Sequence, residues 1–192
     1  MTNSLAGALP NEKALLATAV AEPAAFAAIY DHYFPRVYNY VRYRVADPAA
    51  VDDLAAKIFE KALVYLSSYR AERAPFAVWL FTIARNTVND YLRAQKRHRW
   101  LSLEALGAKL RAPSQPEEVV IEREAHGELL RALSRLGDRE RDLLALKFAV
   151  GLTNRRIAEL TGLSVSNVGV ILYRTIRRLR AELLCQEENH GA

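Results

Sequence analysis

Apolar residues recur along most of the chain at the spacing of an α-helix. One continuous stripe begins at Val51 and returns at every third or fourth position as far as Leu66. This spacing places apolar side chains on one face of a helix and polar ones on the others. Asp47 and Pro48 precede the stripe and supply an N-cap and a first helical residue. The pattern predicts a helix that begins near Pro48 and buries one face.

Similar patterns predict helices on either side of this one. Residues 26–44 carry aromatic side chains at helical spacing, and Pro35 is expected to break that helix or start a new one. Residues 76–99 repeat the spacing, with basic residues gathered at the C-terminal end and Trp79 on the apolar side, where it is expected to join the core. Between Ser67 and Pro75 the chain is polar and basic, which indicates a loop.

The chain divides into two helical parts. Periodicity is lost over residues 100–116, where glycine and prolines favour a linker. Two more helices follow, separated at Gly137, which suits a C′ position, and Asp138, which suits an N-cap. No segment alternates as a strand would. The prediction is an all-α protein of two small helical domains, 23–99 and 117–185, with a lead-in at 1–22, a linker at 100–116 and a tail at 186–192.

Residues 154–180 have the pattern of a helix-turn-helix. Ala158 is small where two helices would cross, Gly162 allows a positive φ in the turn, and Val168 faces back onto the first helix. An ordinary helical hairpin has similar parts. The joint spacing of these three residues, together with the surrounding arginines, favours DNA binding.

The second helix of this motif has a predicted buried face and a predicted reading face. Thr153 and Ser164 suit the N-caps of the two helices. The buried stripe is expected to comprise Val165, Val168, Leu172, Ile176 and Leu179. The opposite face can meet base edges and phosphates in a major groove through Ser166, Asn167, Val170, Tyr173, Arg174 and Arg177.

Basic residues form two clusters within the 192-residue chain, whose net charge is +5. Residues 85–99 contain five basic residues and one acidic residue, and residues 151–180 contain six and one. One cluster in each half indicates two contacts with a polyanion, although solvated helix faces would give the same pattern.

Composition argues against several classes of protein. Hydrophobic residues make up 51% of the chain, which is enough for a packed core. The single cysteine excludes a disulfide framework, and the four histidines are too far apart in sequence to form a metal-ligand pair. There is no glycine-rich phosphate loop, nucleophile elbow or secretory signal pattern. We therefore expect a protein that is not an enzyme, uses no cofactor or metal, and works in a reducing cytoplasm.

Together the two halves resemble an extracytoplasmic-function sigma factor of bacterial RNA polymerase. "VDDLAAKIFEKAL" is similar to the acidic helix of that family's second region, and "FAVWLFTIARNTVNDYLRAQKR" to its Trp-Leu-x-x-Ile-Ala-Arg-Asn stretch. Residues 133–183 are similar to its fourth region. The resemblance implies a nucleoid-associated transcription initiation factor that binds core RNA polymerase, directs it to promoters and helps melt the minus-ten DNA.

The resemblance also assigns each half a form of promoter DNA. The second region would hold the separated minus-ten strand, with one base in a pocket formed partly by residues 67–75. Planar groups for stacking and cations for phosphates are supplied by the candidate minus-ten residues Tyr69, Arg70, Arg73, Asn86, Asn89, Arg93, Lys96 and Arg97. The fourth region would read the minus-thirty-five duplex through Arg155, Arg156 and the reading face named above.

In the family, the acidic helix meets the clamp helices of the polymerase. Asp52, Asp53 and Lys57 are the candidates for that contact here. Ala56 and Lys57 depart from the Gln and Glu that the family usually carries, and a reversed charge at an unchanged interface weakens binding.

Two departures affect the minus-thirty-five contact. Arg155 and Arg156 stand where the family often has acidic residues, which favours a phosphate contact from the first helix of the motif. Gly169 replaces a larger polar residue, so fewer direct base contacts are expected.

Other readings remain open from the sequence alone. A stand-alone helix-turn-helix regulator would need only the second half, and a degenerate sigma factor would bind polymerase without using promoters. Because the family's isolated members are often held inactive by an anti-sigma partner, the expected partners are core polymerase, promoter DNA and an anti-sigma factor.

Overall fold

The computed structural model describes residues 9–105 and 129–190, and all regular structure in these two ranges is helical. The first half contains α1 (Glu12–Ala21), the turn η1 (Pro23–Phe26), α2 (Ala27–Arg44), α3 (Pro48–Val64), the turn η2 (Leu66–Ser68) and α4 (Phe76–Ala105). The second half contains helical residues 129–134, α6 (Asp138–Leu144), the π-helical turn η3 (Ala145–Ala149), α7 (Asn154–Thr161) and α8 (Val165–His190). The all-α prediction is confirmed.

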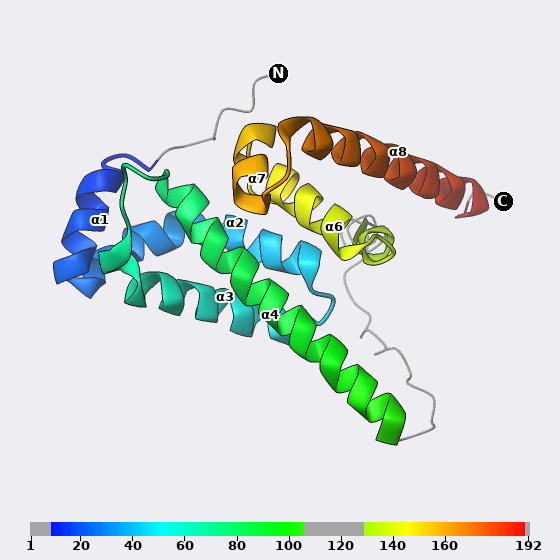
Figure 1. Ribbon diagram of the computed structural model, residues 1–192, viewed down its shortest axis with the longest axis horizontal. Helices are drawn as coiled ribbons and strands as arrows, with labels where there is room; N and C mark the ends of the chain where they lie inside the picture. The colour runs from blue at the N-terminus through cyan, green and yellow to red at the C-terminus, as the bar shows by residue number, and fades with distance from the viewer. Residues whose placement is uncertain (1–8, 106–128, 191–192) are drawn as a thin grey trace.

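Helices α2, α3 and α4 form the body of the first domain (Figure 1). Each contributes a fully buried aliphatic side chain to one core: Ile29 from α2, Ile58 from α3 and Leu80 from α4. The N-cap prediction for α3 is confirmed, since the Asp47 side chain accepts a hydrogen bond from the backbone N–H of Ala49 at 3.1 Å. Burying these apolar stripes supplies the main driving force for packing the three helices.

Helix α1 also packs into this domain. Its Leu16 and Ala19 are buried in the core, and Tyr33 of α2 donates a hydrogen bond to Glu12 Oε1 at 3.1 Å. The predicted lead-in, 1–22, therefore contains a helix that helps to form the core. At the other end of the domain, α4 continues to Ala105, which lies within the predicted linker, and residues 106–116 of that linker are outside the described residues.

Pro35 does not interrupt α2, contrary to the prediction from its ring chemistry. The helix is continuous from Ala27 to Arg44 with Pro35 inside it. A proline in a helix loses one backbone hydrogen bond and crowds the preceding turn. Here the residues on both sides are anchored, because Tyr33 and Val37 are buried in the core. Tertiary packing therefore overrides the local preference.

The helix-turn-helix of the second half follows the predicted local rules. Thr153 accepts a hydrogen bond from the backbone N–H of Arg156 at 3.3 Å, and Ser164 accepts one from Asn167 at 3.1 Å. Gly162 ends α7 with φ 74°, a left-handed conformation that L-residues with a side chain seldom adopt. Ala158 and Val168 are both buried where the two helices meet. The predicted caps, turn and crossing are all confirmed.

Two local predictions in the second half are wrong. Asp138 is not the N-cap of α6, because Gly137 takes that position and its N–H donates to Glu140 Oε2 at 3.0 Å. Asp138 instead points toward the first half of the chain, where Lys96 binds it. Val165 was expected in the buried stripe of α8 but is 50% exposed, because it precedes the point at which α8 crosses α7.

The two halves pack against one another along α2 and α4. Figure 1 shows α6 and α7 beside these helices, while α8 runs along the outer side of the second half. Helix α6 and the turn η3 contact α2, and α7 contacts α4. Contacts across this boundary therefore affect the surfaces that both halves present.

Candidate nucleic-acid and polymerase interfaces

The predicted reading face of α8 lies in solvent. All six of its members are exposed: Ser166, Asn167, Val170, Tyr173, Arg174 and Arg177. The guanidinium of Arg177 lies over the ring of Tyr173, with its Cζ 5.9 Å from the centre of that ring. Asn167 and Val170 flank the buried Val168 at the crossing with α7, and both are exposed. This geometry suits insertion of the start of α8 into a DNA groove.

Helix α7 adds two cations beside this face. Arg155 and Arg156 both pair with Glu159, at 3.4 and 2.7 Å, and the hydrogen bond from Arg156 lowers the pKa of Glu159 below its ordinary value. These pairs are exposed, so the cost of exchanging the carboxylate for a phosphate is small. The two arginines are therefore available for backbone contacts.

The loop of residues 67–75 is closed by its own side chains. Arg70 Nη1 donates to the backbone oxygens of Ser67 and Tyr69 at 2.8 and 2.9 Å, and the Tyr69 hydroxyl donates to the oxygen of Ala74 at 3.1 Å. The Tyr69 ring also packs against Phe76 and Trp79, with ring centres 5.4 Å apart in each case. The Tyr69 side chain thus ties the loop to the start of α4. Trp79 was expected in the core; it is partly buried and packs against the core cluster.

A pocket of about 560 Å³ lies beside this loop. One wall is the loop, with Ser67, Tyr69 and Arg70, and the opposite wall is α1, with Glu12 and Lys13. The sequence reasoning missed the α1 wall, because α1 is distant in the chain and was assigned to a lead-in. A pocket of this size can accept a nucleotide base.

The polar face of α4 carries most of the other minus-ten candidates. Asn86 and Arg97 are exposed, as is Arg73 in the preceding loop. Asn89 and Lys96 have partners: Asn89 Oδ1 accepts a hydrogen bond from Arg44 Nη2 at 2.9 Å, and Lys96 binds Asp138. The exposed Arg93 pairs with Asp90 on the same helix at 3.2 Å.

Asp142 of α6 is the centre of a polar network that sequence reasoning missed. It is 5% exposed, and its Oδ1 accepts a hydrogen bond from the Tyr40 hydroxyl at 2.7 Å and lies 2.5 Å from Arg44 Nη1. Its Oδ2 accepts a hydrogen bond from Arg85 Nε at 2.7 Å. All three partners belong to the first half. Burial, and then the Asp142 charge, raise the pKa of Tyr40.

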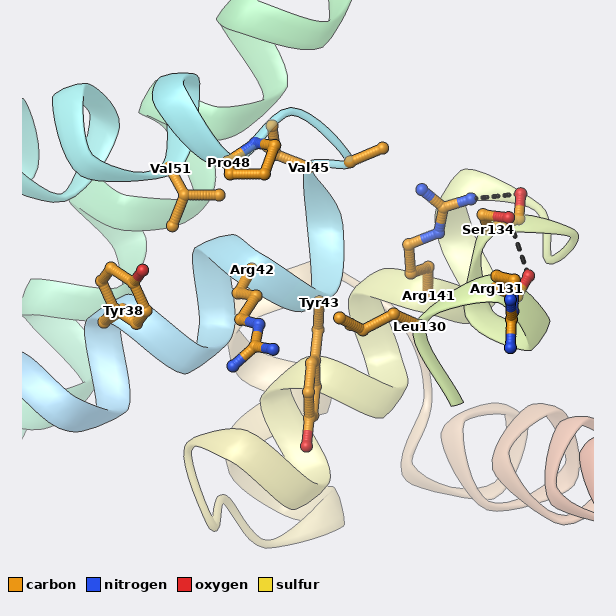
Figure 2. Close-up of a pocket in the computed structure, with 11 residues that line it drawn as sticks. Tyr38, Arg42, Tyr43, Val45, Pro48, Val51, Leu130, Arg131, Ser134 and Arg141 are labelled. Atoms are coloured by element: carbon orange, nitrogen blue, oxygen red, sulfur yellow. Dashed lines mark hydrogen bonds between the residues drawn. The ribbon is translucent and has the colours of Figure 1, made fainter. Parts of the chain in front are cut away.

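A second pocket, of about 510 Å³, lies at the boundary between the halves (Figure 2). Arg42, from α2, and Arg131 and Arg141, from the second half, are among the residues that line it. Arg141 spans the boundary, since it donates to the backbone oxygens of Arg44 and Ser134. Burial lowers the pKa of Arg141. The boundary is thus held by guanidinium groups as well as by apolar packing.

The predicted polymerase contacts lie together on one side of α3. Asp52, Asp53 and Lys57 are all exposed. At the end of the same helix, Val64 and Tyr65 expose 66% and 55% of their surface, although aliphatic and aromatic residues normally turn inward. Sequence reasoning did not single out this apolar end.

No group of metal-ligating side chains occurs within residues 9–105 and 129–190. Parts of the predicted lead-in, linker and second domain, at residues 1–8 and 106–128, lie outside the described residues. Within the described helices, none has the length and apolarity needed to cross a membrane.

The arrangement of a helical first half and a helix-turn-helix second half has a counterpart in sequence families. Residues 29–98 match sigma-70 region 2, and residues 126–179 match sigma-70 region 4. The chain is 32% identical over 159 residues to the ECF RNA polymerase sigma factor BldN of Streptomyces coelicolor, and 30% identical over 176 residues to SigD of Mycobacterium bovis. The chain belongs to the extracytoplasmic-function (ECF) family of RNA polymerase sigma factors.

The two alignments span different shares of the relatives' own lengths. The alignment with BldN spans 82% of this chain and 60% of BldN, and the alignment with SigD spans 89% of this chain and 83% of SigD. The alignment thus leaves out a large part of BldN.

Solved structures show the same fold. The structure of CnrH in complex with the cytosolic domain of CnrY matches with a TM-score of 0.68 at 23% identity, over 91% of this chain and 97% of that one. RpoE of Bartonella quintana, in complex with the anti-sigma factor NepR, matches with a TM-score of 0.64 at 21% identity, over 82% and 96%. These likenesses show that the helical fold of this chain occurs in other proteins.

Proposed function

We propose that this ECF sigma factor binds core RNA polymerase, directs it to a defined set of promoters, and holds the minus-ten DNA in its opened form. The observation that carries this proposal is the presence, in one chain, of two basic surfaces with different chemistry. One is an exposed helix face suited to a duplex groove, and the other is a loop pocket beside a cationic helix, suited to a single strand. Phosphodiester synthesis belongs to the polymerase, since sigma factors are non-enzymatic initiation factors.

The second domain, which we assign to residues 117–185, would read the minus-thirty-five element as duplex. In this assignment Asn167 makes paired hydrogen bonds to an adenine, Val170 packs on a thymine methyl group, and Arg174 reaches a guanine or a phosphate. Arg155 and Arg156 would hold the backbone from α7. Because phosphate contacts orient a protein and base contacts specify its sequence, these two sets have separable effects.

The first domain, which we assign to residues 23–99, would hold the separated minus-ten strand. Asn86, Arg93 and Arg97 present polar and cationic groups along α4 for the backbone. One base would enter the pocket between the loop and α1. Because the Tyr69 ring packs against Phe76 and Trp79, we assign it the role of shaping this pocket. Arg70 bonds the backbone of the loop, and we assign it the role of holding the loop in place.

The exposed side of α3 is the proposed site for the polymerase. Asp52, Asp53 and Lys57 lie there with the apolar end at Val64 and Tyr65. An apolar patch can compensate for the charge that Lys57 reverses, because burial of aliphatic and aromatic surface adds affinity independently of charge. An anti-sigma factor would act on the same kinds of surface, and the bound polymerase would place the protein at the nucleoid.

Transcription from a promoter library tests the assignment. The purified chain and core polymerase are supplied with a DNA library, and the transcripts are sequenced to define the two promoter elements. Arg174→Ala and Asn167→Ala are each expected to weaken selection at minus thirty-five by about 1–3 kcal/mol. Full retention of promoter preference by both variants would contradict the assignment of this α8 face to a DNA groove.

A parallel measurement tests the minus-ten surface. Arg97→Ala is expected to weaken binding of the opened strand and to reduce the salt slope of binding by about 0.7 for the lost phosphate contact. Glu60→Ala, on α3, is the control. The alternative of a stand-alone regulator is not favoured, because region 2 is present alongside region 4.

A further inference from the structure

Three arginines line the pocket of about 510 Å³ at the boundary between the halves: Arg42, Arg131 and Arg141. We propose that this pocket is a binding site for a nucleoside polyphosphate, that is, a planar base joined through its sugar to two or more phosphates. The pocket shares no lining residue with the DNA faces assigned above. The site is therefore a further function of this chain, and it does not depend on promoter binding.

The first observation is a positive charge that nothing in the pocket balances. Figure 2 shows Arg42 on α2 and the other two arginines on the second half of the chain. None of the 11 described residues that line the pocket is an aspartate or a glutamate, so the lining carries three positive charges and no negative one. Like charges in a partly buried pocket repel one another more strongly than in open solvent. An anion in the pocket would remove this repulsion.

Arg141 shows the lack of a counter-charge most clearly. Its guanidinium donates to backbone oxygens, among them that of Ser134 at 2.6 Å, and it pairs with no carboxylate in the described part of the chain. Its Nε is buried and has no hydrogen-bond partner there. At the same boundary, the guanidinium groups of Arg44 and Arg85 both reach a carboxylate, that of Asp142. Because a buried cation without such a partner is costly, an anion beside Arg141 would be bound favourably.

Arg42 and Arg131 supply two further cations. Within residues that the structure describes, neither side chain forms an ion pair or a hydrogen bond. Asp138, whose charge reaches Arg141, is itself bound by Lys96 and does not line the pocket. A guanidinium group can donate two parallel hydrogen bonds to a phosphate, which makes arginine the usual residue for this contact. The charge of the pocket therefore fits a ligand with several phosphates.

The second observation is an aromatic and aliphatic wall beside the cations. Tyr38 and Tyr43 of α2 line the pocket and are half-buried, with part of each side chain packed against the core. Val45 and Pro48 add aliphatic surface. Planar bases stack on aromatic side chains whatever their sequence. Small-molecule pockets typically measure about 300–1,000 Å³, so this one has room for a base as well as its phosphates.

Both halves contribute walls to the pocket, which gives binding a second readout. Arg42 and Arg131 lie in different halves, and one ligand that contacts both would need the halves packed as they are here. A ligand that binds the folded chain and not the unfolded one raises the free energy of unfolding in proportion to the logarithm of its concentration. Tm should therefore rise as the nucleotide concentration rises.

Isothermal titration calorimetry on the full chain tests the site. ATP and GTP are the complete probes, and tripolyphosphate and adenosine are the partial ones. We expect one ATP or GTP to bind per chain, with a matching rise in Tm. Tripolyphosphate should bind at least about fivefold more weakly than ATP because it lacks the stacking base. Adenosine should bind more weakly than ATP as well, because it has no phosphate to meet the guanidinium groups.

Three variants assign the binding to this pocket. Arg42→Gln and Arg131→Gln should each weaken ATP binding about tenfold, since each removes a charge-assisted contact to phosphate. Tyr43→Leu should weaken ATP binding while changing tripolyphosphate binding less than about twofold, because only ATP carries a base. Arg135→Gln is the matched control: Arg135 is exposed and close to Arg131 in the chain, but it does not line the pocket. Its loss should change ATP affinity less than about twofold, because exposed charges are screened.

Several results would overturn the proposal. Absence of saturable ATP and GTP binding is one, and an equal loss of ATP affinity in Arg131→Gln and Arg135→Gln is another, since attraction would then be diffuse. Equal affinities for ATP and tripolyphosphate would reject recognition of a base, and this comparison decides that point if Tyr43→Leu loses helical circular dichroism.

DNA is the other polyanion that this pocket could meet. Binding of a random-sequence single-stranded 20-mer, followed by anisotropy, should change less than about twofold in Arg42→Gln and Arg131→Gln, because neither residue belongs to the assigned DNA faces. If both variants weaken binding of the 20-mer as much as that of ATP, the pocket holds a DNA strand and the nucleotide site is rejected. Promoter selection and polymerase binding are measured separately, so their failure would count against the proposed function alone.

Discussion

Replacing Asp142 by asparagine perturbs the most strongly bonded carboxylate at the boundary. Asparagine has nearly the same shape, so the change removes charge while leaving little empty space. Arg44 is 2% exposed and would keep its positive charge without the carboxylate that faces it. Removing one partner of a buried ion pair typically costs about 3–5 kcal/mol, because the remaining charge stays desolvated. We expect Asp142→Asn to lower the free energy of unfolding by that amount.

Urea unfolding, followed by far-ultraviolet circular dichroism, measures this change. Asp90→Asn is the control, since it breaks a pair with Arg93 in which both side chains are largely exposed, at 66% and 78%. Exposed pairs contribute about 0.2–1 kcal/mol. If Asp142→Asn costs no more than Asp90→Asn at an unchanged slope with urea, Asp142 is not the energetic centre of the boundary.

Three further outcomes follow from the structure. Tyr40→Phe removes one hydrogen bond to Asp142 and should lower the free energy of unfolding by about 1–2 kcal/mol in urea. Burial raises the pKa of Tyr40 above the ordinary tyrosine value of about 10, so its contribution to stability is complete below about pH 10 and is lost as the pH rises further. Tm should therefore fall above that pH, and it should fall less in Tyr40→Phe. Gly162→Ala should lower the free energy of unfolding by about 1–2 kcal/mol through its φ of 74° alone, since an added Cβ has no atom within 4 Å. Gly137→Ala, at φ −63°, should be neutral or stabilising. Equal shifts in Tm for the two variants would contradict the backbone explanation.

Sequence reasoning was most accurate where a contact spans only a few residues. The caps formed by Asp47, Thr153 and Ser164 were predicted correctly because each joins a side chain to a backbone N–H two or three residues later. The turn at Gly162 was predicted for a similar reason, since its positive φ depends on the residue itself. Gly137 replaces Asp138 as the N-cap because Glu140 lies three residues after it, at the position from which a glutamate side chain reaches back to the N-cap N–H.

Contacts between distant parts of the chain could not be predicted in this way. Asp142 and Tyr40 are 102 residues apart, and nothing in the local pattern around either residue indicates the other. The partners of Asp142 depend on how the two domains pack. The same limit applies to the pocket wall from α1, because Glu12 and Tyr69 meet only after α1 folds onto the first domain.

Exposed apolar residues show a related limit. Leu63 fits the apolar stripe of α3, yet it is 37% exposed, although Ala62 before it and Leu66 beyond it are buried. Helical periodicity identifies the face that turns inward but not how far around the helix the neighbouring elements cover it. Residues at the edge of an apolar stripe can therefore remain free for a partner.

Binding to core RNA polymerase tests the central claim most directly. The purified chain is titrated into core enzyme that carries no sigma factor, and complex formation is measured by fluorescence anisotropy before promoter DNA is added. The account predicts a saturable complex with one chain per polymerase, followed by transcription from specific sequences in the promoter library. Absence of binding, under conditions in which an established ECF sigma factor binds, would contradict it.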